Sequence, residues 1–307
     1  MDDSRSNKAG LVAGFAAYIL WSVFPLYFKL LGAASPVEIV AHRIVWSLVF
    51  CAILLTVTHS WGDARGVVAS RRSLLTLMGA GVLVSVNWLI FIAAVNTGHT
   101  LDSSLGYFVN PLVTVALAYA FLHERVRPLQ LIALAICGVA VLVMIIGYGE
   151  FPFIGLSLAL TFGVYGLLKN RVAGKVTPVV GLGIETATVS PIALGYIIYL
   201  QASGQGHFWT DGWALSAELA LAGVVTAIPL LLFAFSAAHL PLTTLGFIQY
   251  ISPIGTFFLG VFVFHEDMPL ARWAGFALIW VALAVLSVDI LARTWRGRRK
   301  PAQSEQT

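Results

Sequence analysis

Ten stretches of about 20 mostly apolar residues occupy nearly the whole chain and restrict the folds that it can adopt. A helix needs about 20 apolar residues to cross a hydrocarbon core about 30 Å thick, because no water there can satisfy free backbone groups. The sequence is 59% hydrophobic and 10% charged, whereas a soluble domain contains about 25% charged residues. We therefore expect an all-α membrane protein. Its ten predicted transmembrane helices lie near 11–31, 37–59, 74–96, 102–122, 129–147, 153–170, 178–200, 214–238, 242–264 and 271–292.

Basic residues fall in every second connecting segment. Arg65, Arg71 and Arg72 lie between the second and third predicted spans, and the last span is followed by a strongly basic tail. Lysine- and arginine-rich short loops stay on the cytoplasmic side of a membrane. This pattern predicts that both termini are cytoplasmic, and it explains the positive net charge without a nucleic-acid partner. The alternate segments without lysine or arginine are 32–36, 97–101, 148–152, 201–213 and 265–270.

One sequence motif occurs twice. SSLGYFVNP (103–111) is followed by the pair His123-Glu124, and TTLGFIQYISP (243–253) is followed, again twelve residues later, by His265-Glu266. Leu105-Gly106 matches Leu245-Gly246 at an offset of 140 residues, and Pro111 matches Pro253 at an offset of 142. The chain therefore contains an internal repeat.

Each copy of the repeat contains five predicted spans. Because five is odd, the second copy enters the membrane from the opposite side, and the two copies are expected to be inverted repeats. The sequence predicts a first five-helix repeat at 8–149, a second, inverted repeat at 150–293 and a basic cytoplasmic tail at 294–307. Inverted five-helix repeats are the architecture that we expect for this fold.

Inverted repeats are typical of secondary transporters, in which two related halves enclose a central site and open it to each side in turn. Channels also contain such repeats, so a channel remains an alternative. An intramembrane enzyme is a further alternative, although the chain contains no HExxH, GxSxG or P-loop motif. The expected partners are a small-molecule substrate and the lipid bilayer, with a possible homodimer. We expect no metal or cofactor, and a proton is a candidate coupling ion.

Polar side chains at helical spacing follow the fourth and ninth predicted spans. Residues three or four apart share one helix face, and a polar face towards lipid would be costly. We expect these two stripes to line a cavity; interhelical hydrogen bonding is the alternative. The stripes are Ser103, Tyr107, Asn110 and Thr114 in the first copy and, for the last three at an offset of 142, Gln249, Ser252 and Thr256 in the second.

Pro111 and Pro253 each lie inside one of these two spans. A proline within a helix removes a backbone donor and frees a carbonyl. We expect a kink at each position, which serves either as a hinge or as a static bend.

Two predicted spans carry charges. His42-Arg43 lies in the second span and Glu185 in the seventh, and an offset of 142 places Arg43 on Glu185. Charges within a membrane are candidates for function. The expected depths of Arg43 and Glu185 differ by roughly 10 Å. Our hypothesis is that they flank a central site, with Arg43 attracting an anionic group and Glu185 a cationic group or a proton. A local structural partner for each is the alternative, such as Glu38 near His42.

Five stretches resemble the RarD family of EamA-type proteins, within the drug/metabolite transporter superfamily. They are AHRIVWS (41–47), NWLIFIAAVNTGH (87–99), SLGYFVNPL (104–112), IET (184–186) and TLGFIQYISP (244–253). The resemblance covers almost the whole chain and implies a ten-helix, multi-pass transporter of the bacterial inner membrane with two EamA repeats. The family motif falls on His42, Arg43, Trp46, Asn87, Trp88, Tyr107, Asn110, Glu185, Gln249 and Tyr250.

The chain departs from the family pattern at Ser252, where a glycine is expected, and at 187–190, which is smaller and more polar than usual. Both changes affect the size of a pocket. The resemblance therefore implies a substrate class no narrower than a small organic metabolite or drug.

Overall fold

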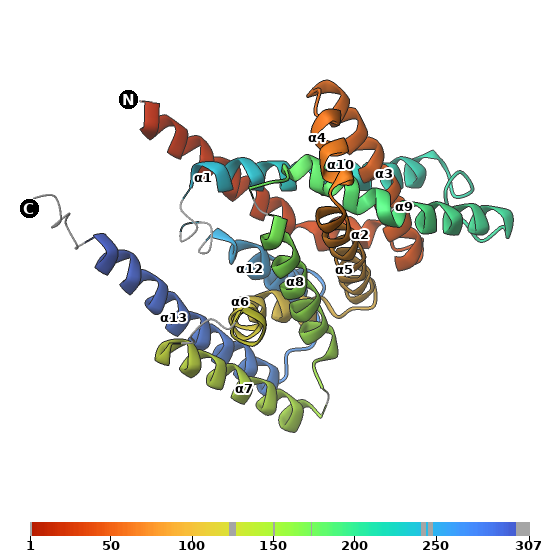
Figure 1. Ribbon diagram of the computed structural model, residues 1–307. Helices are drawn as coiled ribbons and strands as arrows, with labels where there is room; N and C mark the ends of the chain where they lie inside the picture. The colour runs from red at the N-terminus through yellow and green to blue at the C-terminus, as the bar shows by residue number, and fades with distance from the viewer. Residues whose placement is uncertain are drawn as a thin grey trace, which may run out of the picture.

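The fold is known from a computed structural model that describes residues 2–122, 127–149, 151–172, 174–240, 244 and 248–298. Within these ranges the regular elements are all helices, and no strand occurs (Figure 1). The helices are α1 (Asp2–Ser22), α2 (Phe24–Leu30), α3 (Pro36–Val57), α4 (Trp61–Ala69), α5 (Arg71–Asn96), α6 (Thr100–Leu122), α7 (Pro128–Tyr148), α8 (Phe153–Val172), α9 (Pro178–Ala202), α10 (Trp213–His239), α12 (Ile251–Phe258), the π-helix η1 (Leu259–Val263) and α13 (Leu270–Arg298).

Nine helical segments within the described ranges are long and apolar enough to cross a membrane. They coincide with nine of the ten predicted spans. In the remaining span, predicted at 242–264, the described helix is the shorter apolar segment Ile251–Val263. The all-helical membrane fold expected from the sequence is thus confirmed, whereas the tenth crossing stays a prediction. The repeat residues His123, Glu124, Leu245 and Gly246 and the tail residues 299–307 lie outside the described residues.

The short helix α4 is an element that the sequence analysis did not predict. It lies between the second and third spans and buries only Ala64 and Val67, which pack with Leu77 and Ile184. Its nine residues are too few to show a clear helical period among the charged and glycine positions around them.

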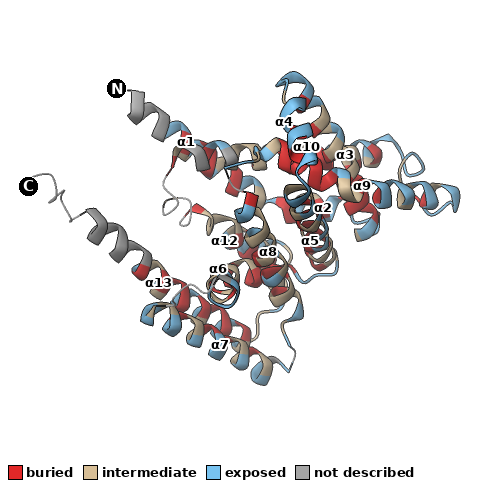
Figure 2. Ribbon diagram, viewed as in Figure 1, coloured by how far each residue is buried: buried red, intermediate tan, exposed pale blue. Residues whose placement is uncertain are grey.

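Apolar side chains cover the outside of the bundle. Buried residues gather on the faces where helices meet, and exposed residues lie on the outer faces (Figure 2). Ile146, Phe153 and Ile192 are 82%, 69% and 76% exposed. Apolar surface this extensive is explained by a lipid environment, because a water-soluble monomer exposes only small apolar patches.

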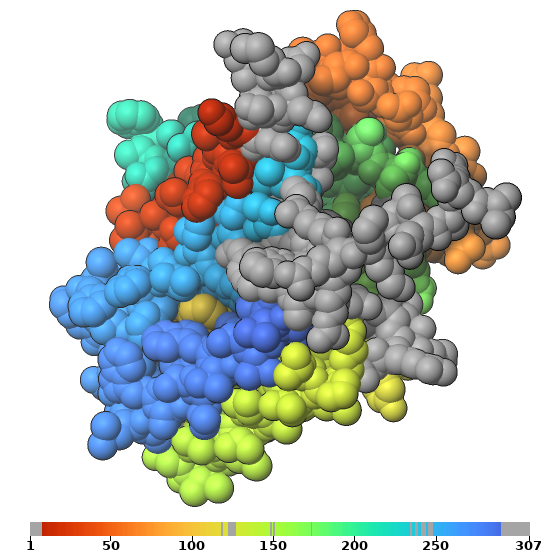
Figure 3. Space-filling model, turned by 90° about the vertical axis from the view of Figure 1, so that its left-hand side faces the viewer, coloured from red at the N-terminus to blue at the C-terminus, as the bar shows by residue number. Residues whose placement is uncertain are grey.

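Helices α7 and α13 form a closely packed pair. They lie side by side along one edge of the bundle (Figure 1), and their atoms touch on the face seen in Figure 3. Small residues make this approach possible. Ala133, Ala140 and Ala282 share a buried cluster with Phe276 and Ile279. This pair forms a scaffold at the side of the molecule.

Glu266 ties the start of α6 to the segment before α13. Its carboxylate oxygens accept hydrogen bonds from the backbone N–H groups of Thr100 at 2.6 Å and Leu101 at 2.8 Å. A carboxylate at a helix N-terminus satisfies free N–H groups and faces the positive end of the helix dipole. The second copy of the His-Glu pair therefore caps a helix of the first copy.

Two glycines, 142 residues apart, set the closest helix approaches near the predicted charged residues. A methyl group added to Gly81 in α5 would lie 2.5 Å from the backbone oxygen of Glu185 in α9. A methyl group added to Gly223 in α10 would lie 2.5 Å from the backbone oxygen of Trp46 in α3. No side chain fits at either crossing, so both pairs of helices are held at backbone contact.

We predict that Gly81→Ala and Gly223→Ala each destabilise the protein, because the added methyl group forces the helices apart. Overpacking of this kind costs about 1–3 kcal/mol. The control is Gly138→Ala in α7, where a methyl group meets nothing within 4 Å. The measurement is the apparent melting temperature in detergent. The control should match or exceed the wild type, and wild-type melting of Gly81→Ala or Gly223→Ala would contradict the close crossings.

Candidate functional site

Helix α3 carries Arg43 into the interior. Ser35 starts the helix by accepting a hydrogen bond from the backbone N–H of Glu38 at 3.2 Å, and Pro36 occupies the first helical position, where its missing N–H is not needed. Two turns later Arg43 is only 4% exposed. The N-terminal cap therefore fixes the register that places a cation among buried helices.

The guanidinium group of Arg43 lies in an aromatic cage. Its central carbon is 4.0 Å from the centre of the Trp88 ring, 5.3 Å from that of Phe28 and 5.7 Å from that of Phe24. Its Nε–H donates to the hydroxyl of Thr226 in α10 at 2.7 Å. Cation–π contacts and one neutral hydrogen bond thus stabilise the charge.

Asn87 and Tyr107 are brought together next to this cage. Asn87 is buried, and its Nδ2 donates to the carbonyl of Leu158 at 3.0 Å and to the hydroxyl of Thr161 at 2.9 Å, both in α8. The Tyr107 hydroxyl donates to Asn87 Oδ1 at 3.2 Å. This network links α5, α6 and α8, and Trp88 follows Asn87 in the chain.

Glu185 is buried at 1% exposure, at the crossing of α9 with Gly81. Lys169 Nζ lies 2.5 Å from its Oε1, and the Tyr165 hydroxyl donates to its Oε2 at 3.3 Å. Both partners lie on α8, four residues apart and therefore on one face. No hydrogen bond or ion pair joins Glu185 to Arg43 in the described part of the chain. A local partner, one of the alternatives raised by the sequence, is present for Glu185.

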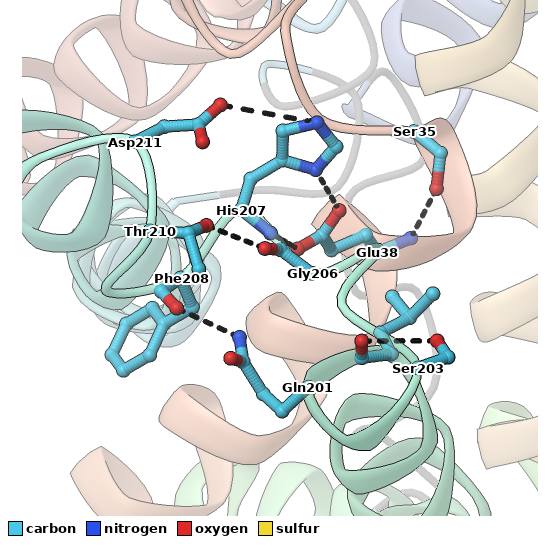
Figure 4. Close-up of polar contacts among 10 residues, drawn as sticks. Ser35, Glu38, Gln201, Ser203, Gly206, His207, Phe208, Thr210 and Asp211 are labelled. Atoms are coloured by element: carbon cyan, nitrogen blue, oxygen red, sulfur yellow. Dashed lines mark hydrogen bonds and ion pairs between the residues drawn. The ribbon is translucent and has the colours of Figure 1, made fainter.

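Glu38 pairs with the segment after α9. Its two oxygens contact the backbone N–H of His207 at 2.8 Å and the His207 ring at 2.7 Å, so the carboxylate lies between Ser35 and His207 (Figure 4). The Phe208 ring stacks on His42 with ring centres 4.7 Å apart. Residues 203–212 thus cover the start of α3, one turn before Arg43.

The first polar stripe does not face a single direction. Ser103 is buried and donates to the carbonyl of Thr100 at 2.7 Å, whereas Thr114 is exposed and donates to the carbonyl of Asn110 at 2.9 Å. The Asn110 Oδ1 is buried and has no hydrogen-bond partner in the described part of the chain. Only Tyr107 of this stripe joins the Asn87 network.

In the second copy, Thr256 is buried at 1% exposure. Three further predicted residues, Gln249, Tyr250 and Ser252, are half-buried. Trp46 is also half-buried, with its ring centre 6.3 Å from that of Phe208.

The two prolines lie in different settings. Helix α6 runs without interruption through Pro111. Pro253 lies in the first turn of α12, directly after a turn at 249–250, rather than in a helix interior. A proline in the first helical turn loses no intrahelical hydrogen bond. The Pro253 carbonyl accepts a hydrogen bond from the Ser104 hydroxyl of α6 at 2.8 Å. The helix break that the sequence predicted within this span is therefore at 249–250, before the proline.

Sequence reasoning missed several partners that shape the site. Thr226, Lys169, Tyr165, Thr161 and His207 lie on helices or segments far along the chain from the groups that they contact. None forms a local motif with its partner. No group of three or more His, Cys, Asp or Glu side chains that could hold a metal occurs among the residues described by the structure.

Comparisons with known proteins agree with the helical pattern. Residues 8–146 match the model of the EamA-like transporter family. "Protein RarD" of Streptomyces exfoliatus is 44% identical over 98% of this chain and 95% of its own, and "Protein RarD" of Escherichia coli K12 is 39% identical over 94% and 97%. The chain belongs to the RarD family of EamA-like transporters. A third RarD protein, "Chloramphenicol-sensitive protein RarD" of Pseudomonas aeruginosa, is 29% identical over 93% of this chain and 95% of its own.

The RarD fold has a counterpart among solved structures. A crystal structure matches 92% of this chain and 98% of its own with a TM-score of 0.61 and 19% identity, which is a likeness of fold alone. The RarD relatives are bacterial, and the nine described apolar helices are those of a multi-pass protein of the bacterial inner membrane. The names of the family and its members are those of transporters rather than enzymes.

We predict that Lys169→Met destabilises this RarD protein more than the double variant Lys169→Met/Glu185→Gln does. Removing one partner of a buried ion pair costs about 3–5 kcal/mol, because it leaves an uncompensated charge. The cost here should be smaller, since the Lys169 side chain is 31% exposed.

Apparent melting temperatures of both single variants and the double variant measure this coupling. Arg171→Met is the matched control, because Arg171 lies near the same end of α8 and is exposed. Additive effects of Lys169→Met and Glu185→Gln would show that the pair is not coupled.

Proposed function

We propose that this protein is a secondary transporter that moves a small organic metabolite or drug across the bacterial plasma membrane by alternating access. The observation that carries the proposal is the set of buried polar contacts between residues 8–149 and residues 150–293. Arg43 bonds to Thr226, and Asn87 bonds to Thr161, across this boundary. A polar seam between two halves provides both a hydrophilic path and a surface along which the halves can rock.

Matched helix contacts support the assignment of two inverted repeats. In the proposed correspondence, α3 is equivalent to α9, α5 to α10 and α1 to α8. The packing of α3 on α10 then has its counterpart in α9 on α5, and that of α1 on α10 in α8 on α5. Close contacts follow the same rule, since Gly163 faces Val113 and Gly255 faces Ser22. Such exchange of partners suits a two-fold relation, with both termini on the cytoplasmic side.

The proposed pathway lies between the halves. It is formed by Arg43, Trp46, Asn87, Trp88, Tyr107, Asn110, Thr114, Glu185, Gln249, Tyr250, Ser252 and Thr256, with hinges at Pro111 and Pro253. The Arg43–Trp88 contact and the Asn87–Tyr107 hydrogen bond support its central part. The turn at 249–250 before Pro253 supports the second hinge.

Proton coupling is part of the proposal, with the buried Glu185 as the group that exchanges a proton. A single chain already brings helices of both halves together at Arg43 and Asn87. A homodimer is therefore not needed to form the pathway and stays a prediction.

Counterflow in proteoliposomes tests the transport function. Vesicles are loaded with unlabelled bacterial metabolite extract and diluted into trace isotope-labelled extract, and the trapped label is identified by mass spectrometry. A carrier exchanges internal for external solute, so wild-type vesicles should transiently accumulate at least one labelled solute above protein-free vesicles. Simple equilibration without overshoot would indicate the channel alternative, and no uptake would contradict transport. Full counterflow in both Arg43→Gln and Glu185→Gln would contradict the proposed pathway residues.

A further inference from the structure

The buried charges of the molecule are unequally compensated. Within the described ranges, four buried charged side chains take part in ion pairs: Glu38 with His207, Glu185 with Lys169, Asp289 with Arg127 and Arg272 with Asp102. Arg43 is also buried, and no described carboxylate forms an ion pair with it. The titratable groups that interact with it electrostatically are the phenols of Tyr27 and Tyr107. Arg43 thus brings a net positive charge into the apolar interior.

The guanidinium group is oriented so that donors remain available. Arginine has five N–H donors, and the hydrogen bond to Thr226 uses only Nε–H. The Thr226 hydroxyl gives its own proton to the carbonyl of Ala222 at 2.7 Å, so it can only accept from Arg43. Trp88 covers one face of the guanidinium plane. The Nη1 and Nη2 groups make no hydrogen bond to described residues, and they point in the plane that a two-oxygen anion would share.

Glu185 offers no equivalent site for a cation. Lys169 already lies against one of its oxygens, and the Tyr165 hydroxyl donates to the other. The two residues that the internal repeat places in register therefore differ in occupancy, because Glu185 has its counter-charge within the protein and Arg43 does not. A substrate that carries both an ammonium and a carboxylate group is not favoured by this arrangement.

We infer that Arg43 binds the anionic group of the transported solute, and that the solute is a small organic monoanion with a flat or apolar body. The anion supplies the missing counter-charge, and its body packs against the aromatic walls formed by Trp88, Phe24 and Phe28. A carboxylate matches the two in-plane donor groups by two parallel hydrogen bonds. This inference rests on the proposed transport function and specifies its substrate class.

Thermal stabilisation by matched probes tests the inference. Benzoate, benzamide and benzylamine share the ring and differ in charge, and each is titrated onto purified protein in detergent at constant pH and ionic strength. A solute that binds the folded state raises the apparent melting temperature with concentration. Benzoate should give a saturable rise in the wild type, and benzamide and benzylamine should give none.

Variants assign the effect to the guanidinium group. Arg43→Gln should weaken benzoate binding at least about tenfold, because a charge-assisted hydrogen-bonded contact is lost. If that variant does not fold, Arg43→Lys keeps the charge but loses the planar pair of donors, and should also weaken binding. Arg127→Gln, in the α7–α13 scaffold pair, is the control and should leave the benzoate shift unchanged.

Three results would overturn the inference. Benzamide could stabilise the protein as well as benzoate does, which would make shape rather than charge the determinant. Benzoate could bind the folded Arg43 variants as tightly as the wild type. Finally, none of the three probes could stabilise the wild type.

A flux measurement separates this inference from the transport function. Benzenesulfonate is used because it stays ionised and does not cross lipid unaided. Stabilisation by benzoate without protein-dependent release of benzenesulfonate would leave the anion site standing and contradict transport. Release of benzylamine or benzamide through wild-type protein that does not bind benzoate would leave transport standing and overturn the anion site.

Discussion

The burial of the Arg43 cation is the constraint on which the rest of this structure depends. An isolated charge within a membrane is costly, and the cost is reduced only by what surrounds it. Here those surroundings are contributed by several elements: Thr226 from α10, Trp88 from α5 and two phenylalanines from α2. These helices must approach closely to reach one side chain, and the glycine crossing at Gly223 allows α10 to do so. Stability and a charged interior site are thus joined in one set of contacts.

The molecule separates into regions with different roles. The α7–α13 pair is closely packed through small residues and a buried aromatic cluster, and its ion pair between Arg127 and Asp289 lies apart from the Arg43 cage. The polar seam between α3, α5, α8, α9 and α10 has a different character, because directional hydrogen bonds and cation–π contacts replace much of the apolar packing. Contacts of this kind can exchange partners when helices shift, whereas interdigitated alanine and aromatic packing resists such movement.

Much of the fold could be predicted from the sequence because the physical signal is local. A run of apolar residues with few charges specifies a spanning helix wherever it occurs, and nine such helices are found in the described ranges. Candidate residues such as Asn87 and Tyr107 were predicted because polar groups are rare in apolar runs. Their partners were not, since Lys169 lies 16 residues from Glu185 and Thr226 lies 183 residues from Arg43. Helix packing decides these pairings, and helical periodicity alone did not reveal that Thr114 points outwards.

Alternating access between the two halves is the central claim of this account, and distances across both ends of the seam test it most directly. Exposed positions allow spin labels at Leu30 and Trp213 for one end, and at Val57 and Lys175 for the other. Double electron–electron resonance should find two distance populations for each pair, with conditions that lengthen one pair shortening the other. A single unchanged distance at each end, or lengthening at both ends together, would contradict the account.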